Sequence, residues 1–111
     1  MSNVAHVTTR RILLIALALT ALAGCGSKFQ TYCQNQADCS GGNDKDVDAC
    51  VAGIEGQKDV AAAYDCSDAF DKAVACYDST GHCKAKAYGT DCAAEVKALT
   101  ECENAASASK Q

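Results

Sequence analysis

The 111-residue chain contains no proline and no tryptophan, and it has only two phenylalanines. Alanine supplies most of the apolar residues that follow position 24. A domain of this size buries little surface on folding, so its hydrophobic core alone should be marginal. Besides four tyrosines, the large apolar residues available to a core are Phe29, Val47, Val51, Ile54, Val60, Phe70, Val74, Val96 and Leu99.

Positive charge is also scarce. After residue 24 the chain has no arginine, and eight lysines stand against fourteen aspartates and glutamates, which gives a formal net charge of −6. Such a surface repels polyanions. We therefore expect no binding to nucleic acid and little attraction to anionic lipid headgroups.

The chain lacks an apolar run long enough to cross a bilayer. Its longest run, Ile12 to Ala23, has twelve residues and is interrupted only by Thr20. A membrane-spanning helix needs about 20 apolar residues. Arg10 and Arg11 precede the run, and a basic flank before a short apolar stretch is typical of a secretory signal. Residues 1–24 are therefore predicted to be an export signal that is removed.

The apolar run ends in Leu22-Ala23-Gly24-Cys25. This segment resembles the lipobox of bacterial lipoproteins, in which small residues admit the signal peptidase and the cysteine thiol accepts diacylglycerol. The resemblance implies cleavage before Cys25, a thioether-linked diacylglycerol on that residue and a third acyl chain on its new amino group. Two or more chains make membrane anchoring stable. Residues 25–28 would then be a lipidated tether.

Two features bear on the route and destination of export. Thr9-Arg10-Arg11-Ile12-Leu13-Leu14 loosely resembles a twin-arginine signal, and two arginines flanking a general secretory signal are the alternative. Gly26 follows the lipidated cysteine, where enteric lipoproteins retained in the inner membrane carry aspartate. The glycine favours the outer membrane, so we expect a cell-envelope protein anchored there through Cys25.

Eight cysteines remain once Cys25 is assigned to lipid: Cys33, Cys39, Cys50, Cys66, Cys76, Cys83, Cys92 and Cys102. An even number in a small exported chain predicts a disulfide framework. The chain has no Cys-x-x-Cys pair, and His82 is the only histidine outside the signal. These absences argue against a zinc centre or a redox carrier, and we expect no cofactor.

Helical spacing dominates the mature sequence. Val47, Cys50, Val51 and Ile54 follow the i, i+3, i+4, i+7 pattern, which predicts a helix beginning at Asn43 or Asp44 and ending near Gly56. Residues 58–77 predict one long helix with a stripe from Val60 to Tyr77, and a last helix should run from Thr90 or Asp91 to about Ala105. Residues 29–40 are expected to form one or two helical turns.

The remaining segments show no strand alternation. Residues 79–90, with Gly81 and Gly89, are predicted to be a loop, and residues 107–111 a flexible tail. The fold expected is therefore all-α. It would be a small disulfide-stapled helical bundle over residues 29–106, built on an antiparallel helical hairpin.

Four cysteines fit one antiparallel register. Nine residues separate Cys66 from Cys76, and nine separate Cys92 from Cys102. In an antiparallel hairpin, paired residue numbers have a constant sum. Pairing Cys66 with Cys102 and Cys76 with Cys92 satisfies that condition, so both bridges can form across one helix–helix interface. Sequence spacing alone does not settle connectivity.

This twin spacing over residues 66–102 resembles the coiled-coil-helix-coiled-coil-helix proteins of mitochondria, although the lipobox argues for convergence. The mature chain also resembles the small cysteine-rich lipoproteins of myxobacteria and their relatives. That likeness depends on the lipobox, the Gly41–Asp44 break before Cys50, the Ala63–Cys66 segment and the eight downstream cysteines. It implies no activity. Three pairings remain for the other four cysteines, and we favour Cys39 with Cys50 and Cys33 with Cys83.

One segment has the spacing of a calcium-binding loop. Asp44, Asp46, Asp48 and Glu55 occupy positions 1, 3, 5 and 12 of an EF-hand-like sequence. Position 6 is Ala49, where the sharp turn of that loop requires glycine. The alternative is an acidic first turn of a helix, which the helix dipole favours.

No arrangement of nucleophile and oriented base is apparent. We therefore expect a non-enzymatic envelope lipoprotein with a structural or protein-interaction role and another envelope protein as its partner. The alternative is a small-ligand or calcium-binding envelope module centred on Asp44–Glu55.

Overall fold

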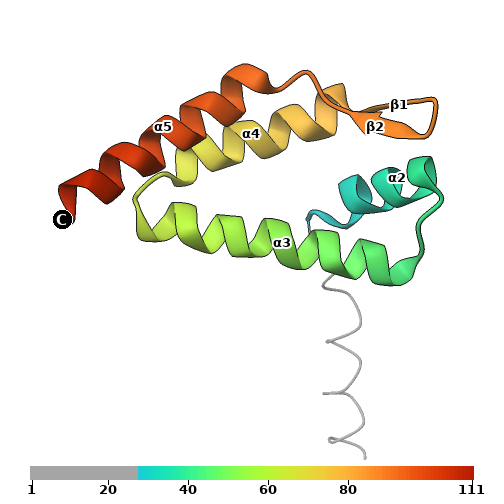
Figure 1. Cartoon of the computed structure of the whole chain (residues 1–111), viewed down its shortest axis with the longest axis horizontal. Helices are drawn as coiled ribbons and strands as arrows, with labels where there is room; N and C mark the ends of the chain where they lie inside the picture. Colours follow the sequence, from blue (N-terminus) through green and yellow to red (C-terminus); the bar gives the residue numbers. More distant parts are fainter. Residues whose placement is uncertain (1–27) are drawn as a thin grey trace, which may run out of the picture.

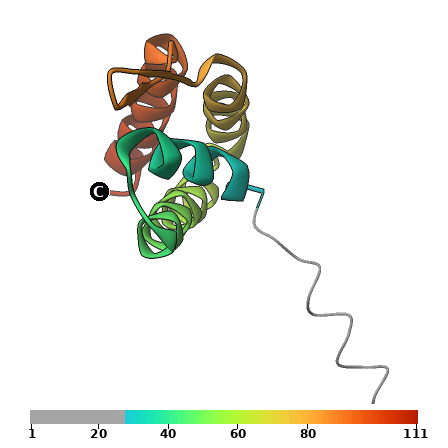
Figure 2. The same cartoon turned by 90° about the vertical axis from the view of Figure 1, so that its right-hand side faces the viewer.

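The computed structural model describes residues 28–111, and the all-α prediction is confirmed there (Figure 1). Four helices form a bundle in which consecutive helices run in opposite directions, and a small β-hairpin joins the last two. Seen from the end in Figure 2, α2 crosses in front of the other three helices. The elements are α2 (Gln30–Ser40), α3 (Asp44–Ala63), α4 (Ser67–Thr80), β1 (His82–Lys84), β2 (Ala87–Gly89) and α5 (Ala93–Ser109).

A tight turn joins α2 to α3. Gly41 has a φ of +76°, a conformation that only glycine adopts without strain, and its N–H donates to the carbonyl of Ala37. Asn43 then caps α3, because its side chain accepts from the N–H of Lys45 at 2.9 Å. The Asp46 carboxylate accepts from the N–H of Asn43 at 2.8 Å and completes a reciprocal cap.

The predicted boundary between the second and third helices is wrong. Helix α3 continues through Gly53 and Gly56 and ends at Ala63, inside the long helix predicted for residues 58–77. There the N–H of Asp65 bonds to the carbonyl of Ala62, and the N–H of Cys66 bonds to that of Ala61. This is a Schellman motif, in which Asp65, at a φ of +58°, occupies the left-handed position that glycine usually fills.

The predicted loop at residues 79–90 contains a β-hairpin. His82 pairs with Gly89, Cys83 with Tyr88 and Lys84 with Ala87. The turn residues Ala85 and Lys86 both have positive φ, as a two-residue hairpin turn of the primed type requires. Strands of three residues are too short for an alternating pattern to be visible in the sequence.

Helix α5 extends to Ser109, so most of the predicted flexible tail is helical. Its end is held by Lys110, whose ammonium donates to the carbonyl of Ala63 at 2.8 Å and lies 4.9 Å from the centre of the Tyr64 ring. These contacts join the end of α5 to the end of α3.

Two disulfides lie across the α4–α5 hairpin: Cys66 is bonded to Cys102, and Cys76 to Cys92. These are the two pairs that the antiparallel register predicts. Cys66 precedes the first residue of α4, and Cys92 precedes the first residue of α5. Each bridge therefore joins the start of one helix to the body of its neighbour.

The other two predicted bridges, Cys39–Cys50 and Cys33–Cys83, are wrong. Cys33 is bonded to Cys50, and Cys39 to Cys83. Cys33 lies eight residues before Gly41 and Cys50 eight residues after Gly42, so the antiparallel α2–α3 register brings them opposite each other. Cys39 is too close to the turn to reach Cys50, and its partner is in the β-hairpin.

The core consists of two small clusters. The first contains Phe29, Ala61, Cys66 and Phe70, and the second contains Cys33, Ala37 and Val47. Ile54 packs against both clusters. Small residues and sulfur thus make up much of the buried volume. Val60 and Val96, two of the large residues available for a core, are instead exposed by 46 % and 39 %.

Candidate functional site

The two exposed valines line one hollow of about 520 Å³. Val60 belongs to α3 and Val96 to α5, and these helices run in the same direction (Figure 1). We call this hollow the α3–α5 groove. It is lined by Gly53, Gly56, Gln57, Val60, Tyr77, Val96, Leu99, Thr100 and Glu103.

Each wall of the α3–α5 groove is one face of a helix. The α3 wall consists of residues 53, 56, 57 and 60, and the α5 wall of residues 96, 99, 100 and 103. Both sets have the spacing i, i+3, i+4, i+7, which places four side chains along one side of an α-helix. Two parallel helical faces therefore border the groove, and Tyr77 of α4 contributes to its lining.

Gly53 and Gly56 have no side chains, so the backbone of α3 is accessible at these two positions of its wall. A Cβ atom built on Gly53 or on Gly56 would meet no atom within 4 Å, so neither glycine is required by internal packing. A second hollow of about 280 Å³ shares Gly53, Gln57 and Tyr77 with the groove and reaches back along α3 to Ala49. The open surface thus follows α3 for about 16 Å, at 1.5 Å per residue.

Glu103 is the only one of the nine lining residues that is charged at neutral pH. Its side chain is half-buried, and among residues 28–111 no ion pair or hydrogen bond of this carboxylate is found. By contrast, Glu101 on the same helix lies 3.6 Å from the ammonium of Lys97. The groove therefore combines an apolar lining with one uncompensated negative charge.

Three tyrosines pack together beside the groove. The rings of Tyr32 and Tyr77 are stacked with centroids 5.5 Å apart, and Tyr88 meets Tyr32 edge-on at 5.6 Å. Burial raises the pKa of Tyr32 above 10.0, and Tyr77, Tyr88 and Asp78 raise it further. Through Tyr32, the cluster connects α2 and the β-hairpin to Tyr77, which lines the groove.

A different hollow, of about 400 Å³, lies between α4 and α5 beside the Cys66–Cys102 bridge. Three alanines, Ala69, Ala94 and Ala98, form part of its lining. Both signs of charge line it, because Asp65, Asp68 and Glu95 are accompanied by Lys72.

The structure does not bring the calcium candidates together in a loop. Asp44, Asp46 and Asp48 occupy the first turns of α3, and Glu55 lies further along the same helix. Residues two apart on a helix point in nearly opposite directions, so the three aspartates do not converge. Asp46 serves as part of the cap of α3. The segment thus has the geometry of an acidic helix start.

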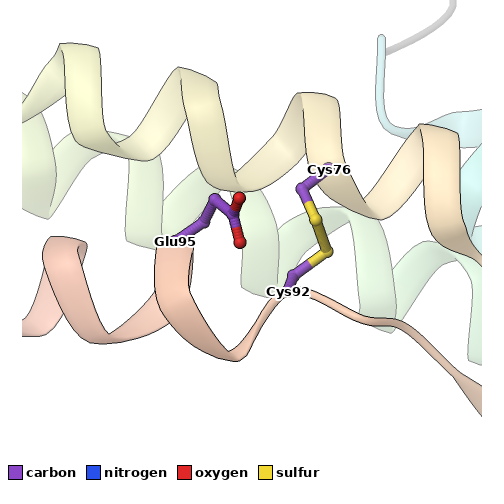
Figure 3. A group of neighbouring side chains, drawn as sticks. All are labelled: Cys76, Cys92 and Glu95. Carbon is purple, nitrogen blue, oxygen red and sulfur yellow. A yellow bond between two sulfur atoms is a disulfide. The ribbon is translucent and has the colours of Figure 1, made fainter.

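One group of residues has metal-ligating atoms close together in the described part of the chain. Figure 3 shows Cys76, Cys92 and Glu95, whose ligand atoms lie within 4.8 Å of one another. The two sulfur atoms are bonded to each other, so neither is the thiolate that a metal requires. His82 lies apart from this group, and its Nδ1 is 3.0 Å from the carbonyl oxygen of Thr80.

The predicted signal at residues 1–24 and the lipidation site at Cys25 lie outside the described residues. Within residues 28–111, no helix has both the length and the apolar character needed to span a membrane. No protein-family model, curated protein or solved structure matches the chain.

The groove was not predicted from the sequence, because Val60 and Val96 are large apolar residues of the kind expected in a core. One signal was present. Gly53, Gly56 and Val60 share one face of a helix at positions i, i+3 and i+7. Two glycines are unusual on a helix face that packs in a core, because glycine weakens a helix.

Proposed function

We propose that this chain is a cell-envelope lipoprotein, cut before Cys25 and acylated there, whose helical domain binds another envelope protein through the α3–α5 groove. The single observation that carries the binding role is the pair of large apolar side chains, Val60 and Val96, exposed together at that groove. Contiguous apolar surface on a small acidic domain is typical of an interaction site.

The start of the domain fits display on a short anchor. Phe29 is 3 % exposed and packs against Ala61 and Phe70, so a residue of the core lies only four positions after Cys25 in the sequence. A fully extended chain of four residues spans at most about 14 Å. The anchor would therefore hold the bundle close to the membrane and restrict its partners to proteins at the same surface.

The construction of the domain also suits an oxidising envelope. Four disulfides fix all four helices and the hairpin in a chain with few large apolar residues. We assign the protein a structural or binding role without enzymatic activity, and Gly26 after the acylated cysteine favours the outer membrane.

Mass spectrometry of the protein isolated from its own cells tests the lipoprotein assignment. We expect an amino-terminal peptide that begins at Cys25 and carries two or three acyl chains. Replacing Cys25→Ser should move the protein out of the membrane fraction. An uncleaved chain, or a Cys25 free of lipid in the membrane fraction, would contradict the proposal.

Affinity purification from detergent-solubilised envelope tests the binding role. The variant Val60→Gln/Val96→Gln should lose the proteins that the parent chain retains, because both valines are exposed and contribute little to folding. The matched control is Glu101→Gln, which changes α5 outside the groove. Retention of the same proteins by the double variant would exclude the groove as the binding surface.

A further inference from the structure

The geometry of the α3–α5 groove points to one kind of occupant: an amphipathic helix of the partner protein with basic residues along its polar edge. This inference rests on the proposed function, since it names the partner chemistry for the same site. It follows from the shape of the groove walls, from their hydrogen bonding and from the charge of the lining.

The spacing of the lining residues fits a third helix. Both walls present positions i, i+3, i+4 and i+7, and helices that pack side by side bury side chains with this spacing. Gly53 and Gly56 have open space where a Cβ would stand, which lets a neighbouring backbone approach α3 closely. The surface from Ala49 to Val60 would accommodate about three turns of helix at 5.4 Å per turn.

The walls also disfavour an extended peptide. Both are α-helices, in which backbone N–H and C=O groups already bond to each other. An extended segment lying between them would find no backbone partners, and unpaired polar groups removed from water cost free energy. A helix satisfies its own backbone hydrogen bonds before it docks. The groove therefore favours a helical segment, which offers apolar side chains while its backbone N–H and C=O groups are already hydrogen-bonded.

The charge of the groove selects a basic segment. Half-buried Glu103 lies at the α3–α5 groove without an ion pair within residues 28–111, and no lysine lines the groove. The mature chain carries a net charge of −6, which disfavours a second copy of itself as the occupant. A lysine or arginine next to the apolar face of the partner helix would pair with Glu103.

Site-specific photocrosslinking in living cells identifies the occupant with the full chain in its own envelope. A benzoylphenylalanine is placed at Gln57 or at Thr100, which are exposed positions on the two walls. The matched controls carry the same residue at Gln34 on α2 and at Lys97 on α5, outside the groove. The crosslinked peptides are then sequenced.

We expect adducts from positions 57 and 100 and none from positions 34 and 97. The captured peptide should contain apolar residues at i, i+3, i+4 and i+7 and at least two lysines or arginines. Capture of a lipid acyl chain, of a second copy of this chain, or of a segment without that pattern would overturn the inference, as would equal capture at the control positions. A lack of acylation on Cys25 would instead overturn the lipoprotein assignment.

Two matched variants of α5 test whether Glu103 pairs with a cation of the partner helix. Glu103→Gln should lower the crosslinking yield from Gln57 about fivefold, the effect of one partly buried charge pair. Glu101→Gln changes the same helix by the same chemistry, but Glu101 faces Lys97, so the yield should stay constant. Equal yields from the Glu103 and Glu101 variants would show that the occupant does not use a cation there. Mapping of the four disulfides verifies that each variant is folded.

Discussion

Phe29 meets Phe70 edge-on, with ring centroids 6.0 Å apart and ring planes at 89°. Phe29 directly follows the predicted tether, and this contact packs it against a buried side chain of α4. In a domain with two phenylalanines and no tryptophan, the pair supplies a large share of the aromatic burial. The beginning of the domain is therefore also part of its core.

Replacing Phe29→Ala should lower the free energy of unfolding by about 3 kcal/mol or more, the usual cost of deleting a buried aromatic ring. Chemical denaturation of the oxidised protein measures the change. Val60→Ala is the matched control and should stay within about 0.5 kcal/mol, because exposed side chains contribute little. A similar loss in both variants would contradict the packing described for Phe29.

The Cys39–Cys83 bridge should be the first to open under mild reduction. Cys83 is exposed and Cys39 half-buried, whereas the other three bridges each contain one cysteine that is at most 2 % exposed. Attack by a thiolate requires access to sulfur. Alkylation after stepwise addition of reductant, followed by mass spectrometry, should therefore label residues 39 and 83 first, while far-ultraviolet circular dichroism still reports a helical bundle.

Earlier labelling of Cys66 and Cys102 would contradict that order. A useful comparison is the double variant Cys39→Ser/Cys83→Ser, which should keep the α4–α5 hairpin and its two bridges. We expect it to show no early labelling, since the exposed pair has been removed.

Millimolar calcium should leave the thermal midpoint unchanged. On α3, Asp46 points away from Asp44 and Asp48, and it is part of the helix cap. Calorimetric scans with calcium and with a chelator measure this. A rise in the midpoint with calcium would restore the ligand-binding alternative for this segment.

The same region offers a test of the cap itself. Asn43→Ala removes the acceptor for the N–H of Lys45 and should cost about 1 kcal/mol of stability. Asn43→Asp retains an acceptor and should stay close to the parent. Equal losses in the two variants would mean that the Asn43 side chain has another role.

Stability should fall as the pH rises above the ordinary tyrosine pKa. The folded pKa of Tyr32 is raised above 10.0, first by burial and then by its neighbours Tyr77, Tyr88 and Asp78. Above pH 10 the unfolded chain therefore releases a proton that the folded protein still holds, which favours unfolding. Below that pH the stability contribution is fully present.

Thermal unfolding between pH 9 and pH 11 measures this effect, with Tyr32→Phe as the variant and Tyr64→Phe as the control. The decline with pH should be shallower in the Tyr32 variant only. Equal slopes in the parent and in Tyr32→Phe would contradict the assignment of the raised pKa to this residue.

The sequence alone determined the all-α class and predicted the α4–α5 disulfide pairing that the structure confirms, because both depend on local regularities. Helical spacing repeats within each segment, and the equal spacing of Cys66–Cys76 and Cys92–Cys102 is a property of an antiparallel pair of helices. The same rule applied around Gly41 and Gly42 would have paired Cys33 with Cys50. The sequence indicated the break at Gly41–Asp44, but it predicted only one or two helical turns before it, whereas α2 extends over Gln30–Ser40.

Tertiary structure decided the rest. Nothing local stops a helix at Ala63, since neither glycine nor proline follows, yet the chain turns there with Asp65 in a left-handed conformation. The turn lets α4 pack back on α3 and brings Cys66 to Cys102. Gly53 and Gly56 remain helical because α3 is capped at Asn43 and packed at Ala61. The free-energy differences of helix propensity are small compared with those of tertiary contacts. The exposed groove and the Cys39–Cys83 bridge therefore could not be predicted from local sequence and follow from the fold of the whole domain.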